Sequence, residues 1–250
     1  MKIDLNCDLG ESFGMYKLGD DDNIMPYISS ANIACGFHAG DPQIMVKTVR
    51  LAIKFGVAVG AHPGYPDLQG FGRRAMQLTA DEIESIVLYQ IAALQGIAKA
   101  EGTQLRHVKP HGSLYNLASI DRTCANAIAR AVAKFDDNLV LVALAGSELI
   151  KAGEEYGLRV ANEGFPDRAY LPDGNLKSRN QPGSVLHDPN LVAENAVRLA
   201  NDGIRVQSKS SNEWLKVDTL CLHGDNPESV ENANLVRQRL MAAGFEVSGL

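Results

Sequence analysis

Four histidines and one aspartate occupy the same kind of place in this sequence. His38, His62, His111 and His223 each close a short apolar, β-prone run, and Asp8 ends the run KIDLNCD. Helix-like segments follow these runs after a few residues. Enzymes with parallel strands assemble their active sites from side chains at the carboxyl ends of successive strands. The pattern therefore predicts one pocket lined by these five side chains.

The elements that must position these side chains alternate along the whole chain. We predict strands near 2–8, 31–37, 57–61, 106–110, 139–145, 158–163, 217–223 and, weakly, 245–248, with helices near 21–28, 42–55, 79–101, 120–135, 147–156, 189–202 and 227–243. Unbroken alternation of this kind favours a parallel sheet with crossover helices. We therefore expect one domain over 1–250, an α/β fold built as an irregular, seven-stranded (β/α) barrel, with an added β-hairpin near 204–217. An open doubly wound sheet is the alternative.

Side-chain parity predicts which face of each strand carries the chemistry. Asp4, Asn6 and Asp8 share one face of the first strand, and Lys109 and His111 share one face of the fourth. The opposite faces are apolar and must lie under the helices, because successive strand residues point to opposite sides. The polar faces are therefore predicted to point into the barrel.

Two long segments, 64–78 and 164–187, precede helices and are expected to be lids or binding loops. They carry Arg73, Arg74 and Arg168, which are either exposed to solvent or form a clamp for a carboxylate or phosphate. Lys109 needs an anionic partner if it is buried. We expect either a bound ligand or an ion pair with Asp4, Asp8 or Glu163.

The remaining histidines, His107 and His187, lack the strand-end position, and we interpret both as structural or surface residues.

A divalent metal is a further hypothesis for the strand-end cluster. Imidazole and carboxylate ligands suit Zn²⁺, Mn²⁺ or Fe²⁺, and the available set is Asp8, His38, His62 and His111. The sequence has no HxxxH or HExxH spacing, so the ligands of such a metal would come from separate strands. No phosphate-binding glycine motif is present.

Composition narrows the class of protein. The formal net charge is −6 and basic residues form no cluster, which argues against nucleic acid or a membrane surface as partner. The four cysteines form no CxxC pair, and no secretory signal precedes the first strand. We therefore expect reduced thiols and a cytoplasmic location.

Long motifs in this chain resemble those of one known family. The segments DLNCDLGESFG, ANIACGFHAGDP, GAHPGYPD with GFGRR, VKPHGSLYN, NEGFPDRAY and LCLHGDNP occur in this order between residue 2 and about residue 240. Together they resemble the LamB/YcsF family, whose members are described as one subunit of the bacterial 5-oxoprolinase.

The resemblance implies a barrel of the glycoside hydrolase/deacetylase type and the ATP-dependent opening of 5-oxo-L-proline to L-glutamate, with release of ADP and phosphate. ATP, together with Mg²⁺, is then a co-substrate, and the chain works with the companion 5-oxoprolinase subunits B and C. Neither the resemblance nor the motifs say which of the three proteins binds ATP.

The residues suggest roles in this reaction. The catalytic candidates are Asp8, His38, His62, His111, Glu163 and His223. A water-activating base would be Asp8 or one of His38, His62 and His111, and Glu163 or another histidine would protonate the leaving nitrogen. The candidates for binding substrate or nucleotide are Asn6, Arg73, Arg74, Lys109, Arg168 and Asp225.

Two rival hypotheses remain open. The chain could be a metal-dependent deacetylase or amide hydrolase that needs no ATP, which would follow from the histidine cluster and the fold analogy. Alternatively, it could be a non-catalytic component that only captures the lactam.

Overall fold

Parallel strands close into a barrel in the computed structural model, which describes residues 1–178, 181–207, 212–222 and 229–250. Among these residues, seven strands pair in the order β1 (Lys2–Leu9), β2 (Ser30–Ala34), β3 (Ala58–His62), β4 (Leu105–Val108), β5 (Val140–Leu144), β6 (Arg159–Gly164) and β9 (Thr219–Leu222). Pairing of β1 with β9 closes the ring, and β10 (Glu246–Val247) adds to the start of β1. The predicted barrel is confirmed, and the open sheet is excluded.

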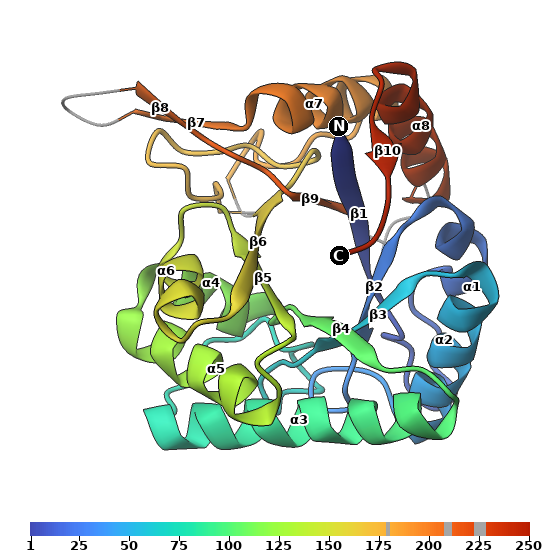
Figure 1. Ribbon diagram of the computed structural model, residues 1–250, viewed down its shortest axis with the longest axis vertical. Helices are drawn as coiled ribbons and strands as arrows, with labels where there is room; N and C mark the ends of the chain where they lie inside the picture. The colour runs from blue at the N-terminus through green and yellow to red at the C-terminus, as the bar shows by residue number, and fades with distance from the viewer. Residues whose placement is uncertain (179–180, 208–211, 223–228) are drawn as a thin grey trace.

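Helices surround the barrel, as Figure 1 shows. They are α1 (Asp21–Ile24) with the 3₁₀ turn η1 (Met25–Tyr27), α2 (Pro42–Phe55), α3 (Ala80–Ala100), α4 (Gly112–Ile120), α5 (Arg122–Phe135), α6 (Glu148–Glu155), α7 (Pro189–Asp202) and α8 (Ser229–Ala242). Within the described ranges, no helix combines the length and apolar composition needed to cross a membrane. The strands β7 (Ile204–Gln207) and β8 (Asn212–Leu215) pair antiparallel and project away from the barrel.

The structure contains one helix, α4, that was not predicted from the sequence. The segment before residue 120 folds as α4, which buries Leu114, Tyr115 and Ala118. Asp121 then caps α5 by accepting a hydrogen bond from the backbone N–H of Cys124. The predicted helix over 120–135 corresponds to α5, whereas α4 was missed, because its Gly-Ser start resembles a loop in sequence.

The predicted inward direction of the polar strand faces is confirmed by hydrogen bonds that cross the pore. Asn6 on β1 donates to Glu163 Oε1 on β6 over 3.0 Å. His107 Nε2 on β4 lies 2.7 Å from Asn32 Oδ1 on β2. Neither pair joins neighbouring strands, so these side chains meet inside the barrel.

The outward faces form the main core. Leu5, Cys7 and Leu9 of β1 are buried under the helices, where Val49 of α2 and Leu94 of α3 are also buried. Removal of this apolar area from water supplies the main driving force for wrapping the helices around the barrel. The barrel therefore holds the strand ends, and the polar groups on them, in fixed positions.

Close packing inside the pore gives a first prediction. A Cβ atom added to Gly60 on β3 would lie 2.1 Å from Nε2 of His107. Because this ring is fully buried, Gly60→Ala is expected to lower the free energy of unfolding by about 3 kcal/mol, at the upper end of ordinary overpacking costs. Urea unfolding measures the effect. The matched control is Gly96→Ala on α3, where the added methyl meets nothing within 4 Å; equal stability of the two variants would contradict the packing argument.

Candidate active site

A pocket of about 670 Å³ opens at the carboxyl ends of the strands. Six of the residues predicted from the sequence line it: Asp8, His62, Arg73, Lys109, His111 and Arg168. Its size suits a small organic substrate together with part of a larger one. The barrel thus brings side chains from β1, β3, β4 and two loops to one place.

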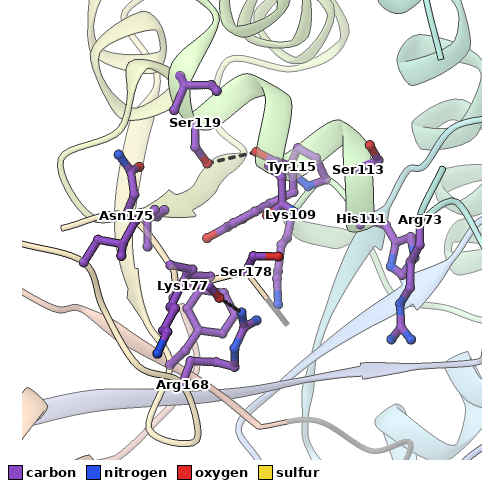
Figure 2. Close-up of a pocket in the computed structure, with 18 of the residues that line it drawn as sticks. Arg73, Lys109, His111, Ser113, Tyr115, Ser119, Arg168, Asn175, Lys177 and Ser178 are labelled. Carbon is purple, nitrogen blue, oxygen red and sulfur yellow. Dashed lines mark hydrogen bonds between the residues drawn. The ribbon is translucent and has the colours of Figure 1, made fainter. Parts of the chain in front are cut away.

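Both long loops contribute to this pocket, as the sequence predicted. The loop 64–78 supplies Arg73, and the loop 164–187 supplies Arg168 and Lys177 among others. Figure 2 shows Arg73 and His111 on one side of the pocket, with Asn175 and Lys177 on the other. The pocket therefore lies between the two loops.

Lys109 lies at the bottom of the pocket in an ion-pair network. Its Nζ lies 2.9 Å from Asp8 Oδ1, 2.9 Å from Glu163 Oε1 and 3.0 Å from Cys221 Sγ. Two of the three predicted anionic partners are therefore present, whereas Asp4 accepts hydrogen bonds from Ser29 and Ser30 instead. Burial disfavours the ammonium, but attraction to the carboxylates outweighs it and raises the pKa of Lys109 well above its usual range.

Asp8 is the carboxylate that faces the pocket. Its side chain is 16% exposed, and its second oxygen lies 3.3 Å from His62 Nε2. Burial opposes ionisation, but attraction to His62 and Lys109 lowers the pKa of Asp8 well below its usual range. Asp8 is therefore an anion at neutral pH, able to accept a proton or to bind a cationic or hydrogen-bonding group.

Three histidines and one glutamate gather beside Asp8. His62 Nε2 lies 3.0 Å from His111 Nδ1, and the ring of His38 stacks on His111 with centroids 3.7 Å apart. Glu11 Oε1 approaches His38 Nε2 at 3.4 Å and His111 Nδ1 at 3.5 Å. Burial lowers the pKa of His111 to about 3 and that of His38 well below its usual range. Both rings are therefore neutral at pH 7 and available as bases or metal ligands.

Glu163 lies behind the pocket wall. It is fully buried, and the hydroxyl of Tyr115 donates to its Oε2 over 2.6 Å. Tyr115 itself lines the pocket. Burial, and then repulsion by Glu163, raise the pKa of Tyr115 well above its usual range. A proton passing between Glu163 and a ligand would therefore move through Tyr115 or Lys109.

The remaining predicted arginines and histidines differ in their contacts and exposure. Arg74 pairs with Asp67 within its own loop. Arg168 is buried rather than solvent-exposed, and donates to the carbonyl oxygens of Lys177 and Ser184 over 2.6 and 3.3 Å. It therefore holds the loop 164–187 together as well as lining the pocket. His107 lies in the pore, and His187 is exposed.

His223 and Asp225 lie outside the described residues.

Two residues of the site were missed by sequence reasoning. Glu11 follows the first strand by two residues, in the loop between Leu9 and α1, and strand periodicity gives no signal there. Tyr115 was missed because it lies on α4, the helix that was not predicted. The sequence did contain one signal for Glu11: it is an acidic residue close after the strand that carries Asp8.

The buried His107 predicts a pH dependence of stability. Burial lowers its pKa to about 3, so the folded protein keeps it neutral while the unfolded chain binds a proton near pH 6.5. Stability is therefore lost as pH falls below 6.5, by about 1.4 kcal/mol per pH unit from this residue. Urea unfolding at pH 7, 6 and 5 should show that slope reduced in His107→Gln. The matched control is His187→Gln, and an unchanged slope in His107→Gln would contradict the assignment.

The barrel is similar to known deacetylase folds at low sequence identity. A family 4 carbohydrate esterase from Streptomyces lividans superposes with a TM-score of 0.50 at 15% identity, covering 100% of this chain and 92% of that one. At this identity the likeness concerns the fold alone. It agrees with the expected glycoside hydrolase/deacetylase type of barrel.

Closer relatives match the whole chain. A 5-oxoprolinase subunit from Pyrococcus furiosus is 54% identical over 250 residues, covering 99% of this chain and 97% of its own length. The protein of the same name from Bacillus subtilis is 51% identical, covering 100% of this chain and 97% of its own. The crystal structure of a "Lactam Utilization Protein" from Thermus thermophilus superposes with a TM-score of 0.92 at 50% identity, with both chains fully covered. The LamB/YcsF family model matches residues 3–250, and the chain belongs to this family.

Proposed function

We propose that this chain is the LamB/YcsF-type component of an ATP-dependent 5-oxoprolinase, which hydrolyses 5-oxo-L-proline to L-glutamate while ATP is converted to ADP and phosphate. The observation that carries the proposal is the identity of more than half of the residues, end to end, with a relative named as a 5-oxoprolinase subunit. The matched region covers 99% of this chain, so it includes the barrel strands and the loops that line the pocket.

The charges in the pocket suit anionic ligands. Its basic lining residues are Arg73, Lys109, Arg168 and Lys177, and its acidic ones are Asp8 and Asp173. 5-Oxoproline carries a carboxylate, and ATP carries its phosphates with Mg²⁺. Arg73 is exposed at the pocket and stacks over Phe71 at 4.9 Å. We assign Arg73 and Lys109 to the substrate carboxylate or the transferred phosphate, since basic groups bind both.

The chemistry requires activation of a poor electrophile. A five-membered lactam is a resonance-stabilised amide, which water attacks slowly. Transfer of the γ-phosphoryl group of ATP to the lactam oxygen would give a phosphorylated imidate and ADP. Water then adds to that carbon, the ring C–N bond breaks with protonation of nitrogen, and a second water attacks the resulting acyl phosphate at carbon to release phosphate. The balance is one ATP and two water molecules consumed for each glutamate.

The pocket supplies groups for these steps. Asp8 is ionised, partly exposed and next to His62, so we assign Asp8 as the base that takes the proton from water. His111 lines the same wall. Lys109 would stabilise the negative charge of the transferred phosphoryl group, because its ammonium is already held in place by two carboxylates. We assign protonation of the leaving nitrogen to Tyr115, whose hydroxyl is hydrogen-bonded to Glu163.

The word "subunit" in the relatives' name implies an assembly. We propose that the partners are the companion subunits B and C, and that the complex works in the cytoplasm, where ATP is available. The isolated chain is then expected to turn over 5-oxoproline slowly or not at all.

Reconstitution tests this function. The purified chain, mixed with subunits B and C, ATP and Mg²⁺, is expected to convert 5-oxoproline to glutamate, with loss of product when this chain or ATP is left out. L-Proline, which lacks the lactam carbonyl, is the matched control substrate. Glutamate formation that does not require this chain would overturn the proposal.

A second candidate rests on the cluster of Glu11 with His38, His62 and His111, which suits a metal-dependent amide hydrolase. Such an enzyme would need no ATP. Turnover of an amide substrate by the isolated chain without ATP, abolished by a chelator, would favour it over the 5-oxoprolinase.

A further inference from the structure

Two ring nitrogens in the histidine cluster have their protons fixed by backbone carbonyls. His62 Nδ1 lies 2.7 Å from the carbonyl oxygen of Lys109, and His111 Nε2 lies 2.8 Å from that of Phe71. A carbonyl oxygen can only accept, so each of these nitrogens must carry a hydrogen. In the neutral rings, His62 Nε2 and His111 Nδ1 are then both left with bare lone pairs.

These two lone-pair nitrogens face each other. The distance between them is 3.0 Å, and both rings are buried. Two acceptors at hydrogen-bond distance repel each other unless a cation lies between them. That cation is either a shared proton, which makes one ring an imidazolium, or a metal ion.

Two further donor atoms point to the metal ion. Glu11 Oε1 lies 3.5 Å from His111 Nδ1 and 3.4 Å from His38 Nε2. His38 is 1% exposed, yet neither of its ring nitrogens makes a hydrogen bond. A shared proton would use only two of these atoms. A metal ion would use all four, which lie within 4.8 Å of one another.

The spacings also suit coordination. Metal–nitrogen and metal–oxygen bonds of about 2.0–2.1 Å at a tetrahedral centre place neighbouring ligand atoms roughly 3.3–3.4 Å apart. Three of the six spacings among the four donor atoms are 3.0, 3.4 and 3.5 Å, and all six are within 4.8 Å. Because His38 and His111 are stacked with an angle of 5° between their planes, one of these rings would tilt when both bind one ion.

We propose that Glu11, His38, His62 and His111 bind one divalent transition-metal ion of the Zn²⁺, Mn²⁺ or Fe²⁺ class. Three imidazoles and one carboxylate exclude a preference for Mg²⁺ or Ca²⁺, which select oxygen ligands. The set differs from the one predicted from sequence, since Glu11 takes the place of Asp8. Asp8 pairs with Lys109 through Oδ1 at 2.9 Å, and its Oδ2 lies 3.3 Å from His62 Nε2, but Asp8 is not among the four residues whose donor atoms all lie within 4.8 Å of one another.

The proposed metal site borders the pocket. His62 and His111 line the pocket from the wall that also carries Asp8. An ion held there would be able to polarise a substrate oxygen or lower the pKa of a bound water. The inference does not depend on the proposed 5-oxoprolinase function, because it rests on the tautomers and spacing of this chain's own side chains.

Cobalt binding tests the site without any substrate. The full chain, stripped with a chelator and titrated with Co²⁺, is expected to bind one equivalent in calorimetry and to develop the visible absorption of nitrogen-coordinated cobalt. Glu11→Gln and His38→Ala should each weaken binding by more than about tenfold, since each removes a ligand or its charge. Circular dichroism of both variants checks that they are folded.

His187→Ala is the matched control, because it removes an exposed histidine far from the cluster in sequence and should leave binding unchanged. Absence of saturable cobalt binding would overturn the proposal and favour a shared proton. Equal affinity in the wild type and in the folded Glu11→Gln and His38→Ala variants would also overturn it, since the ion would then bind elsewhere.

Discussion

Replacing Lys109 with methionine is expected to lower kcat of the reconstituted complex by about 10²–10³-fold, the usual cost of removing a donor that stabilises developing negative charge. The ammonium lies 2.9 Å from both Asp8 and Glu163. Its removal leaves two buried carboxylates without their cation, so the free energy of unfolding should also fall, by about 3–5 kcal/mol. Steady-state kinetics and urea unfolding measure the two effects.

A second substitution separates the two effects of Lys109. Lys109→Met combined with Glu163→Gln should recover part of the lost stability, because one uncompensated charge is gone, but should not recover activity. Lys47→Met is the matched control, since Lys47 forms an exposed ion pair with Asp22. Full activity in Lys109→Met would mean that this ammonium does not act on the substrate.

Asp8→Asn is expected to lower kcat by about 10²–10⁴-fold, the range associated with loss of a positioned general base. The change keeps the shape of the side chain and removes its charge. Asn32 donates to Asp8 Oδ1 over 2.8 Å, and the new amide oxygen can still accept that bond. Because the pKa of Asp8 is lowered, the wild-type carboxylate is ionised across the neutral range. The activity lost in Asp8→Asn should therefore not be recovered at higher pH.

Activity of the Asp8→Asn variant is measured in the complex with subunits B and C. Asp22→Asn, which neutralises an exposed aspartate, is the matched control. If Asp8→Asn and His111→Ala both reconstitute full activity, the assignment of the base to this wall of the pocket is wrong.

The strand-borne part of the pocket could be predicted from the sequence because strand geometry is regular. Alternation with period two places Asp8 on the inward face of β1, and Lys109, one residue past the end of β4, continues the inward face of that strand. His62 ends β3, and closure of the barrel brings all three together. Their ion pairs follow from the same rule, since a buried ammonium must meet a carboxylate.

The loop-borne part could not be predicted in the same way. Glu11 follows β1 by two residues and was not predicted. His38 was predicted for this site as the end of a strand near 31–37, but β2 ends at Ala34, and beyond it the chain has no period that fixes side-chain direction. Their approach depends on tertiary contacts, such as the stacking of His38 on His111. Prediction of Tyr115 as a site residue required recognition of α4. This helix starts at Gly112, which has φ +55° and resembles a turn in sequence.

The contacts of Arg168 could not be predicted from the sequence for a different reason. The sequence places it in a long loop, which suggests either solvent exposure or a ligand clamp. The structure buries it against carbonyl oxygens of its own loop, because the described residues of this loop pair with one another through isolated bridges, such as Arg168 with Val185. Contacts within a loop produce no periodic pattern of residues from which they could be predicted.

Oxygen-isotope transfer tests the central claim most directly. 5-Oxoproline labelled with ¹⁸O at the lactam carbonyl is turned over by the complete complex with ATP, and the released phosphate is analysed by mass spectrometry. If ATP activates the lactam oxygen as a phosphorylated imidate, the phosphate should carry the label, with one ADP formed for each glutamate. Glutamate formed without labelled phosphate, or without ATP consumption, would contradict the account.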